Sequence, residues 1–270
     1  MVVQHNVTAM NANRQLGITT GIQAKSSEKL SSGYKINRAA DDAAGLAISE
    51  KMRRQIRGLT QASSNAQDGI SMAQTAEGAL NEVHDMLQRM NELANKAATE
   101  TLTSADRSYI QQEVTALGNE IDRTANDTKF NELDLLNSSA TSYKIQVGAD
   151  NGQYITITMK SMKASDLSVK SLDVGSQAAA SSAIASIKTG IDKLSSMRAD
   201  LGAVQNRLEH TVKNLDNVVE NTQAAESQIR DTDMATEMVK YSNNNILAQA
   251  GQSMLAQANQ SNQGVLSLLG

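Results

Sequence analysis

Cysteine, proline and tryptophan are all absent from this sequence, and phenylalanine occurs once. Without cysteine the chain can form no disulfide, no thiolate metal site and no cysteine nucleophile. Proline interrupts helices, so its absence suits very long ones. A globular enzyme of 270 residues would ordinarily pack several large aromatic side chains, whereas the apolar residues here are mainly Ala, Leu, Ile, Val and Met. The composition therefore favours long helices over a compact enzyme core.

Strong net charge and long apolar runs are also lacking. The formal net charge is −4, so we expect no nucleic-acid partner. No stretch approaches about 18 consecutive apolar residues, so we expect no membrane insertion. The first residues have neither a basic nor an apolar signal region, so we expect no cleaved secretory signal. The basic run KMRRQIR (51–57) lacks interleaved aromatics and is interpreted as a solvated or subunit-facing helix surface.

Small and apolar residues recur from position 59 to position 97 at alternating spacings of three and four. This pattern, the first seam, is typical of a coiled coil and predicts a helix about 58 Å long. Its many alanines allow neighbouring helices to approach closely, which indicates a bundle. The first seam comprises Leu59, Ala62, Ala66, Gly69, Ala73, Ala76, Leu80, Val83, Leu87, Met90, Ala94 and Ala97.

A second seam with the same spacing runs from position 184 to position 219, with Arg198 and Gln205 at two of its positions. A shorter helix is predicted around 110–121, with an N-cap region at Ser104. The two long helices flank a predicted hairpin, so we expect them to pair antiparallel. The apolar members of the second seam are Ile184, Ile187, Ile191, Leu194, Leu201, Leu208, Val212, Leu215 and Val219.

The hairpin prediction covers residues 143–159, where apolar and polar residues alternate on both sides of Asp150-Asn151-Gly152. Residues 160–180 are expected to form an exposed return loop. The predicted fold is therefore mainly α: a long antiparallel helical bundle with one small β-hairpin.

Weak apolar stripes mark the two ends of the chain, together with several glycines that each cost a helix interior about 1 kcal/mol relative to alanine. We expect these ends to become helical only when they pack together on assembly. The stripes contain Val3, Val7, Met10 and Leu16 at one end, and Leu247, Ala250, Met254, Ala258, Leu266 and Leu269 at the other.

Catalytic and metal chemistry finds little support. The three histidines, His5, His84 and His210, form no metal-binding spacing, and no glycine-rich phosphate loop is present. We expect no catalytic site, no metal and no cofactor. The adjacent carboxylates Asp41 and Asp42 lie where strong helical character begins, close to Asn37. There they can accept hydrogen bonds from free backbone amides, and an interface role is favoured over catalysis.

Three long stretches resemble bacterial flagellin: LSSGYKINRAADDAAGLAISEKMRRQIRGL (30–59), ADLGAVQNRLEH (199–210) and AESQIRDTDMATEMVKYSNNNILAQAGQSMLAQANQ (225–260). The final VLSLLG matches as well, so the resemblance covers essentially the whole chain. It implies a structural subunit that self-assembles into the flagellar filament for swimming. The chain is short between 138 and 180, where many flagellins insert outer domains, so we expect none here.

The resemblance also implies a division of the chain. Residues 1–42 and 236–270 would form the inner filament core, and residues 43–235 a helical rod domain. The terminal assembly helices would use Val3, Val7, Met10, Leu247, Met254, Leu266 and Leu269. A connecting spoke would place Asn37, Asp41, Asp42, Ala43 and Gly45 at a crowded subunit junction.

Partners follow from the same resemblance. They are other copies of the chain, an export chaperone at the C-terminal segment, and the filament cap and hook-junction proteins. The protein would be secreted by the flagellar type III system and reside in the extracellular flagellum. LQRMNELA (87–94) with Glu113 resembles the segment recognised by Toll-like receptor 5. Gln88, Arg89, Leu93 and Glu113 match it, with Arg89 and Leu93 expected to share a helix face as an exposed arginine beside a leucine, whereas Asn91 stands where arginine is common.

Two alternatives remain open from the sequence. A hook–filament junction protein shares the terminal pattern, although such proteins usually match the signatures less well. A secreted enzyme built on a helical scaffold would need a catalytic cluster, and the sequence offers none.

Overall fold

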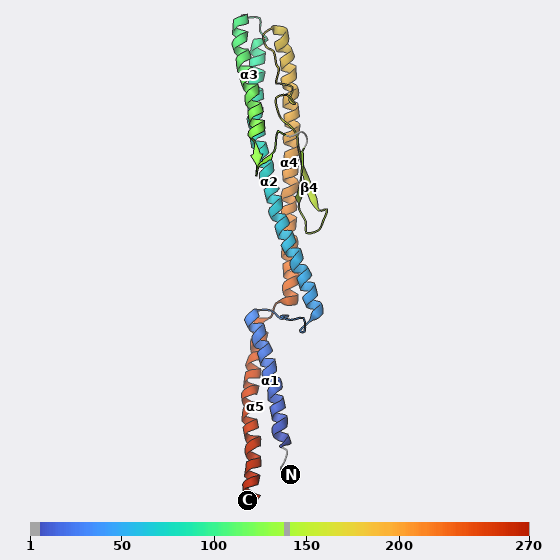
Figure 1. Cartoon of the computed structure of the whole chain (residues 1–270), viewed down its shortest axis with the longest axis vertical. Coiled ribbons are helices and arrows are strands. Elements are labelled where there is room, and N and C mark those ends of the chain that lie inside the picture. Colours follow the sequence, from blue (N-terminus) through green and yellow to red (C-terminus); the bar gives the residue numbers. More distant parts are fainter. Residues whose placement is uncertain (1–5, 138–140, 270) are drawn as a thin grey trace. The chain divides into compact units, whose positions relative to one another are not determined.

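A computed structural model describes residues 6–137 and 141–269, with side chains described to residue 261 (Figure 1). Its helices are α1 (Val7–Ser32), α2 (Ala43–Ala97), α3 (Ser104–Asp127), α4 (Gln177–Arg230) and α5 (Met234–Leu269). Its strands are β1 (Lys129–Phe130), β2 (Leu133–Asp134), β3 (Thr141–Gln146) and β4 (Tyr154–Met159). The predicted mainly helical class with a small β-hairpin is confirmed.

The chain divides into two compact units. Unit 1 contains Met1–Arg54 and Asn221–Gly270, and unit 2 contains Gln55–Glu220. Both α2 and α4 contribute residues to both units. The predicted division at 42/43 and 235/236 concerns the layers of an assembly, so it stays a prediction.

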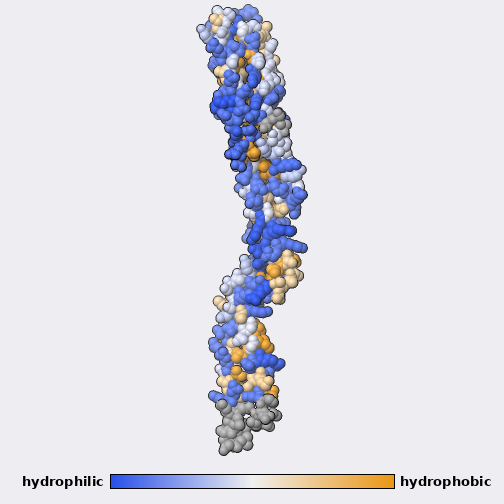
Figure 2. Space-filling model, viewed as in Figure 1, coloured by the Kyte–Doolittle hydropathy of each residue, from blue (hydrophilic) through white to orange (hydrophobic). Residues whose placement is uncertain are grey.

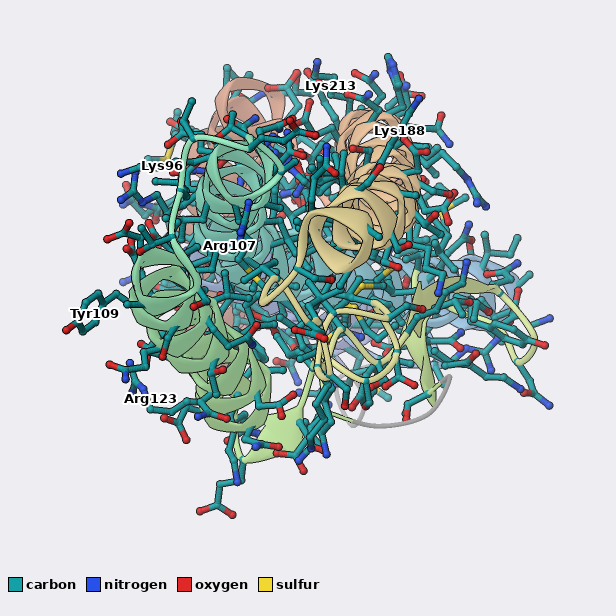
Figure 3. The ribbon with its side chains drawn as sticks, turned by 90° about the horizontal axis from the view of Figure 1, so that it is seen from above. Lys96, Arg107, Tyr109, Arg123, Lys188 and Lys213 are labelled. Carbon is teal, nitrogen blue, oxygen red and sulfur yellow. The ribbon has the colours of Figure 1, made fainter. Side chains whose placement is uncertain are left out.

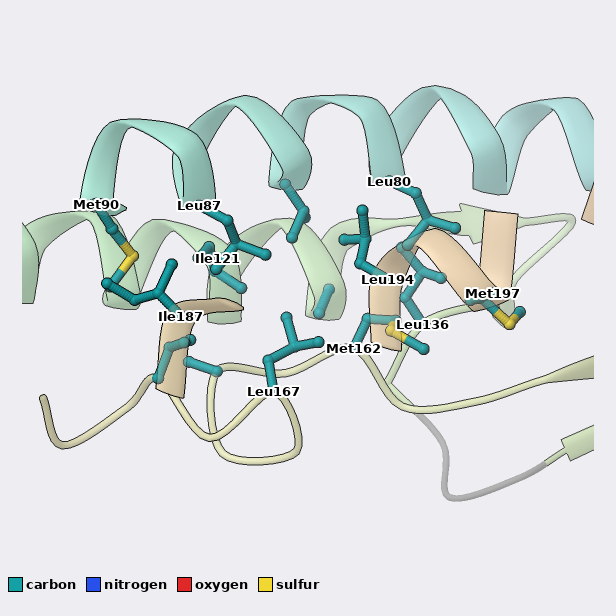
Figure 4. Close-up of a cluster of buried hydrophobic side chains, with 14 of the residues drawn as sticks. Leu80, Leu87, Met90, Ile121, Leu136, Met162, Leu167, Ile187, Leu194 and Met197 are labelled. Atoms are coloured by element: carbon teal, nitrogen blue, oxygen red, sulfur yellow. The ribbon is translucent and has the colours of Figure 1, made fainter. Parts of the chain in front are cut away.

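The core of unit 2 is built by α2, α3 and α4. Every residue of the first seam is buried, as its spacing predicts. Figure 4 shows Leu80, Leu87 and Met90 of α2 pointing into the same interior as Leu194 of α4. Leu80, Leu87 and Met90 are fully buried. Alternating spacings of three and four keep one face of a long helix turned toward its partners, so the first seam stays buried along its whole length.

The buried face of α4 differs in part from the second seam. Met197 is buried, whereas Arg198 lies beside it and forms an ion pair with Glu77 of α2 at 3.8 Å. Ile184 and Ile191 are half-buried at the flank. The buried face of α4 is formed by Ala180, Ala183, Ile187, Gly190, Leu194, Met197, Leu201, Leu208 and Leu215.

The main hairpin pairs β3 with β4 in the antiparallel register that joins Ile145 to Ile155 and Tyr143 to Ile157. The apolar residues of β4 face the helices, and Ile157 and Met159 are fully buried. The Tyr143 hydroxyl donates to the Asp134 carbonyl at 2.7 Å, which ties the hairpin to the segment that precedes it.

The segment 160–176 corrects the prediction of an exposed return loop. Met162, Leu167, Val169 and Val174 are buried, and Figure 4 shows Met162 and Leu167 pointing into the helical core. Lys193 of α4 donates from Nζ to a carbonyl of this segment, that of Asp166, at 2.7 Å. The expectation was wrong because the segment has no period of two or 3.6. Its apolar residues are instead buried at irregular intervals along one side of the helical bundle.

Two local features were not predicted. The β1–β2 hairpin turns at Asn131 and Glu132, both with positive φ, as a tight two-residue turn requires. The N-cap of α3 is Thr103 and not Ser104: its hydroxyl accepts from the Asp106 amide, while the Asp106 carboxylate accepts from the Thr103 amide. This reciprocal capping box begins α3.

Candidate functional site

In unit 1, α1 and α5 pack against each other in antiparallel directions (Figure 1). The Asn6 side chain donates to the Ala258 carbonyl at 3.0 Å, and the side chain of Leu16 fills the space beside Gly251. Most of the residues turned inward are small or polar, and Leu16, Leu30 and Leu255 are the large apolar ones among them. The inward residues are Ala9, Ala12, Leu16, Thr19, Gln23, Ser26 and Leu30 of α1, and Glu237, Tyr241, Asn244, Ala248, Gly251, Leu255 and Ala258 of α5.

Most residues of the apolar stripes predicted for the ends lie outside this inward face, although Leu16 and Ala258 belong to it. Val7 and Met10 of α1 are 69% and 66% exposed, and Leu247 and Met254 of α5 are 57% and 61% exposed. Val3 lies outside the described residues, and Leu266 and Leu269 lie outside the range of described side chains. Of the described stripe residues, Leu16 and Ala258 take part in the pairing of the two helices, whereas the exposed ones do not, and their role in assembly stays a prediction.

Unit 1 consequently carries many large apolar side chains at its surface, and Figure 2 shows hydrophobic patches on it. Large apolar side chains that gather at a protein surface mark interaction sites. The exposed apolar residues of α1 and α5, here named the outward residues, are Val7, Met10, Ile18, Ile22, Met234, Met238, Val239, Ile246, Leu247 and Met254.

A buried polar pair lies between α1 and α5. Ser26 and Glu237 are both buried, with 3% and 7% of their surface exposed. The hydrogen bond from the Ser26 side chain lowers the pKa of Glu237, and the charges of Lys240 and Lys29 lower it further. Buried charges are tolerated when they are paired and hydrogen-bonded, as this carboxylate is.

The adjacent carboxylates at the start of α2 accept backbone hydrogen bonds, as predicted. Asp42 Oδ1 accepts from the Gly45 amide at 2.9 Å and so caps α2. Asp41 Oδ2 accepts from the amides of Arg38 at 3.0 Å and Asn37 at 3.3 Å. The bond from Arg38 is the main reason why the pKa of Asp41 is lowered. Both carboxylates therefore shape the turn between Asn37 and α2.

The close approach at Gly45 lies within the chain. A Cβ at this position would lie 2.5 Å from Asp42 Oδ2 and 2.8 Å from Ile36 Cδ1. Gly45 and Ile36 are buried, whereas Ala43 is exposed. Gly45 is therefore needed for the packing of this turn within the chain. Ala43, which is exposed, remains accessible to another molecule.

Sequence reasoning missed the contacts of Arg230 at the end of α4. Its carbonyl accepts from the Lys35 amide at 2.6 Å, and its Nη1 lies 2.9 Å from Glu50 Oε1 on α2. Its guanidinium also lies 4.6 Å from the centre of the Tyr34 ring. The hydrogen bond from Arg230 is the main cause of the lowered pKa of Glu50. No periodic signal marks such a contact, because it joins segments far apart in the sequence.

The residues predicted for receptor recognition lie on neighbouring faces of α2 and α3. Arg89 Nη2 lies 2.9 Å from Glu113 Oε1, and both side chains are about half exposed. Gln88 is exposed beside them and contacts His84 at 2.8 Å. Leu93 is only 4% exposed, so Arg89 is the exposed member of the two and Leu93 is buried.

Leu93 instead lines a hollow of about 530 Å³ between the two helices. Lys96 lines the same hollow from α2, and Ile110 and Tyr109 line it from α3. Figure 3 shows Tyr109 projecting outward from α3, in agreement with its exposure of 70%. The surface is therefore a charged rim, with Arg89 and Glu113, around a partly apolar depression.

Within the described residues, no group of three or more His, Cys, Asp or Glu side chains is placed to hold a metal ion. None of the helices described combines the length and the apolar character needed to cross a membrane. The features that stand out are therefore surfaces and helix contacts.

Comparison with known families identifies the chain at both ends. Residues 3–141 match the bacterial flagellin N-terminal helical region, and residues 184–269 match the bacterial flagellin C-terminal helical region. Together these matches cover well over half of the sequence. They include α1, α2 and α3 on one side of the main hairpin and most of α4 and α5 on the other.

Individual proteins give the same result. The chain is 52% identical over its full length to a flagellin of Halalkalibacterium halodurans, and the match also covers all of that protein. It is 49% identical to the flagellar filament 31.3 kDa core protein of Treponema maltophilum and 47% identical to a flagellin of Bacillus subtilis, again with both chains fully covered.

Solved structures show the same fold. The crystal structure of Bacillus cereus flagellin is 30% identical, with a TM-score of 0.51, and the match covers 56% of this chain and 88% of that one. A putative flagellar hook-associated protein from Vibrio parahaemolyticus has a TM-score of 0.59 over 71% of this chain and all of its own. It is only 14% identical, so it supports the fold alone.

Proposed function

The chain belongs to the bacterial flagellin family and is a structural subunit of the flagellar filament, and we propose that the outward residues of α1 and α5 make its contacts with other copies. It is a short member without a separate outer domain. Flagellins are structural proteins and not enzymes, which removes the alternative of a secreted enzyme. The high identity to full-length flagellins favours the filament subunit over the hook–filament junction protein.

The exposure of the outward residues carries this proposal. The inward face of the α1–α5 pair consists mostly of small and polar residues, whereas large apolar side chains such as Met10, Ile18 and Leu247 stay exposed. Each such side chain contributes about 1.5–3 kcal/mol when it is transferred from water into an apolar contact. A second copy of the pair presents the same kind of surface, and repeated burial would stabilise a polymer strongly.

Single substitutions on this surface test the proposal. Leu247→Gln and Met254→Gln remove apolar surface from α5, and they should prevent salt-induced polymerisation while circular dichroism of unit 2 is unchanged. Leu133→Gln is the matched control, because Leu133 is also exposed, at 45%, but lies on β2. Sedimentation and electron microscopy would report filaments. Normal filaments from both α5 variants would refute the assignment of this surface.

The connecting turn belongs to the same proposal. Asn37, Asp41 and Asp42 form the turn that leads into α2, and Ala43 is exposed at the start of that helix. Small exposed side chains let another subunit approach the backbone closely. We therefore assign Ala43 to a subunit junction, while Gly45 supports that junction from within its own chain.

Export and assembly partners are part of the proposal as well. The family resemblance implies secretion through the flagellar type III system to an extracellular filament, with a chaperone bound to the C-terminal segment. The exposed apolar side chains of α5 give such a chaperone a surface to cover before assembly. Filament cap and hook-junction proteins would contact the same terminal helices at the two ends of the polymer.

Recognition by Toll-like receptor 5 is a second proposed function, supported by the surface between α2 and α3. Gln88, Arg89 and Glu113 are exposed there, and Leu93 contributes through the hollow that it lines. Arginine is enriched at binding hot spots, and here two carboxylates hold its guanidinium in place at the surface.

A further inference from the structure

Asn151 and Gly152 lie at the tip of the main hairpin, between β3 and β4, and no contact proposed for the filament uses them. Residues 149–154 are all exposed. Gly152 has a φ of 88°, a backbone conformation that glycine adopts freely and other residues rarely do. Asn151 is the one asparagine of the chain that is followed by glycine.

Two glutamines hold the tip without engaging this dipeptide. The Gln146 side chain donates to the carbonyls of Gly148 at 2.9 Å and Asp150 at 2.7 Å, and Gln153 Oε1 accepts from the Asp150 amide at 3.2 Å. No hydrogen bond among the described residues engages the side-chain amide of Asn151 or the backbone N–H of Gly152. Both groups are therefore available to react with each other.

We propose that Asn151 is a site of spontaneous deamidation in the folded protein. Hydroxide removes the proton from the Gly152 amide nitrogen, which attacks Cγ of Asn151. A bond forms between that nitrogen and Cγ, the bond from Cγ to Nδ2 breaks, and Nδ2 takes a proton from water and leaves as ammonia, so that hydroxide is regenerated and a succinimide ring remains. Water then opens the ring at one of its two carbonyls and gives aspartate or isoaspartate. No oxidant or reductant takes part.

The glycine makes this position different from the other exposed asparagines. Without a Cβ, Gly152 leaves its nitrogen unshielded and allows the backbone rotation that ring closure requires. Asn131 is also an exposed turn residue, but Glu132 follows it. In helices the amide that would attack is held in the i to i−4 hydrogen bond and lacks this freedom.

The product changes both the charge and the main chain of the tip. Deamidation adds one negative charge next to Asp150 in a chain whose formal net charge is already −4. Isoaspartate also lengthens the backbone by one methylene. The tip packs closely on α2, since a Cβ on Gly58 would lie 2.9 Å from the Cβ of Ala149. A longer backbone should therefore disturb the contact between the tip and α2.

Peptide mass spectrometry of aged native protein tests the proposal, whether or not filaments form. Trypsin releases residues 145–160, which contain Asn151, and residues 130–144, which contain Asn131. On incubation at mildly alkaline pH, the 145–160 peptide should accumulate the deamidated mass and split into aspartate and isoaspartate forms. Asn131 should stay an amide. Raising the pH should increase the rate, because hydroxide removes the attacking proton.

Asn151→Gln is the matched variant, because it keeps an amide while ring closure would need a larger, slower-forming ring. Its 145–160 peptide should stay intact under the same conditions. The wild-type chain unfolded in urea provides the reference for an unprotected Asn-Gly pair. The proposal would be overturned if Asn151 in native protein stays an amide while Asn151 in the unfolded chain deamidates. Equal deamidation of Asn131 and Asn151 in native protein would also overturn it.

Discussion

Arg89 of α2 and Glu113 of α3 join neighbouring helices through an ion pair in which Nη2 lies 2.9 Å from Oε1. Glu92 holds Nη1 of the same guanidinium at 3.1 Å. Both partners of the interhelical pair are about half exposed, so solvent screens the attraction and it contributes little to stability. The pair therefore orients Arg89 at the surface more than it holds the fold together.

Arg89→Ala should consequently weaken receptor binding far more than folding. We expect a loss of about 2 kcal/mol, or roughly thirtyfold in affinity for the Toll-like receptor 5 ectodomain. Thermal unfolding should change little. Arg123→Ala is the control, because Arg123 on α3 is also exposed and paired with carboxylates, Glu120 and Asp127. Asn91→Arg should strengthen binding if the arginine common in the family contributes.

Monomer and filament should differ in the same assay. If neighbouring subunits cover this face in the filament, only released monomer binds the immobilised receptor. Unchanged affinity of the Arg89→Ala monomer, or filaments that bind as well as monomer, would reject this face as the receptor surface.

Leu87→Ala should destabilise unit 2 strongly. Leu87 is fully buried in the first seam, and loss of a buried leucine side chain costs about 2–5 kcal/mol through lost transfer energy and the cavity that remains. Urea unfolding followed by circular dichroism would measure the change. Leu133→Ala serves as the control at an exposed leucine, and a surface change of this kind stays within about 0.5 kcal/mol. Equal effects of the two substitutions would contradict the packing of this core.

Much of unit 2 could be predicted from the sequence, because its elements obey a strict period. The first seam runs from Leu59 to Ala97 without a break, and each of its residues is buried. The alternation of apolar and polar residues on both sides of Asp150-Asn151-Gly152 likewise predicted the hairpin. The segment with Met162 and Leu167 could not be placed in this way, because its burial depends on a gap that only the assembled helices create.

The terminal helices show the opposite case. Val7 and Leu247 look like core residues in a single helix, yet they are exposed, and small and polar residues such as Ser26 form most of the inward face of the α1–α5 pair. An apolar stripe indicates that a helix packs against a partner, but it does not indicate whether that partner belongs to the same chain. Arg230 was missed for a related reason, since its contact with Glu50 joins positions far apart in sequence.

Ala43→Leu and Gly45→Val should separate assembly from local folding. Ala43 is exposed, so added bulk there should leave the monomer intact and hinder polymerisation. Gly45 faces Asp42 and Ile36, so valine should disturb the start of α2 even in monomer, at about 1–3 kcal/mol for overpacking. Circular dichroism and sedimentation distinguish the two effects. Normal filaments from Ala43→Leu would exclude that residue from a subunit junction.

Protease resistance should differ between monomer and filament at the two ends. The α1–α5 pair buries mainly small and polar residues, so we expect it to open readily in monomer. Limited proteolysis of monomer should remove terminal residues and leave a core that contains unit 2. In filaments, where other copies cover the outward residues, the same ends should resist. Equal resistance in monomer and filament would argue against pairing on assembly.

Acid should weaken filaments in part through Glu237. Its carboxylate faces Ser26 and Lys29 from α1 and Lys240 from its own helix, and the hydrogen bond from Ser26 is the first cause of its lowered pKa. A carboxyl group whose pKa is lower when folded contributes stability above its unfolded pKa and loses it as the pH falls through the folded value.

Glu237→Gln keeps a hydrogen-bonding side chain but removes the charge, so its filaments should be weaker than wild type near neutral pH, and the difference should shrink in acid. Glu209→Gln, on an exposed face of α4, controls for the loss of one carboxylate. Light scattering of filaments against pH would measure dissociation, and a difference between wild type and Glu237→Gln that stays constant down to strongly acidic pH would rule out this role.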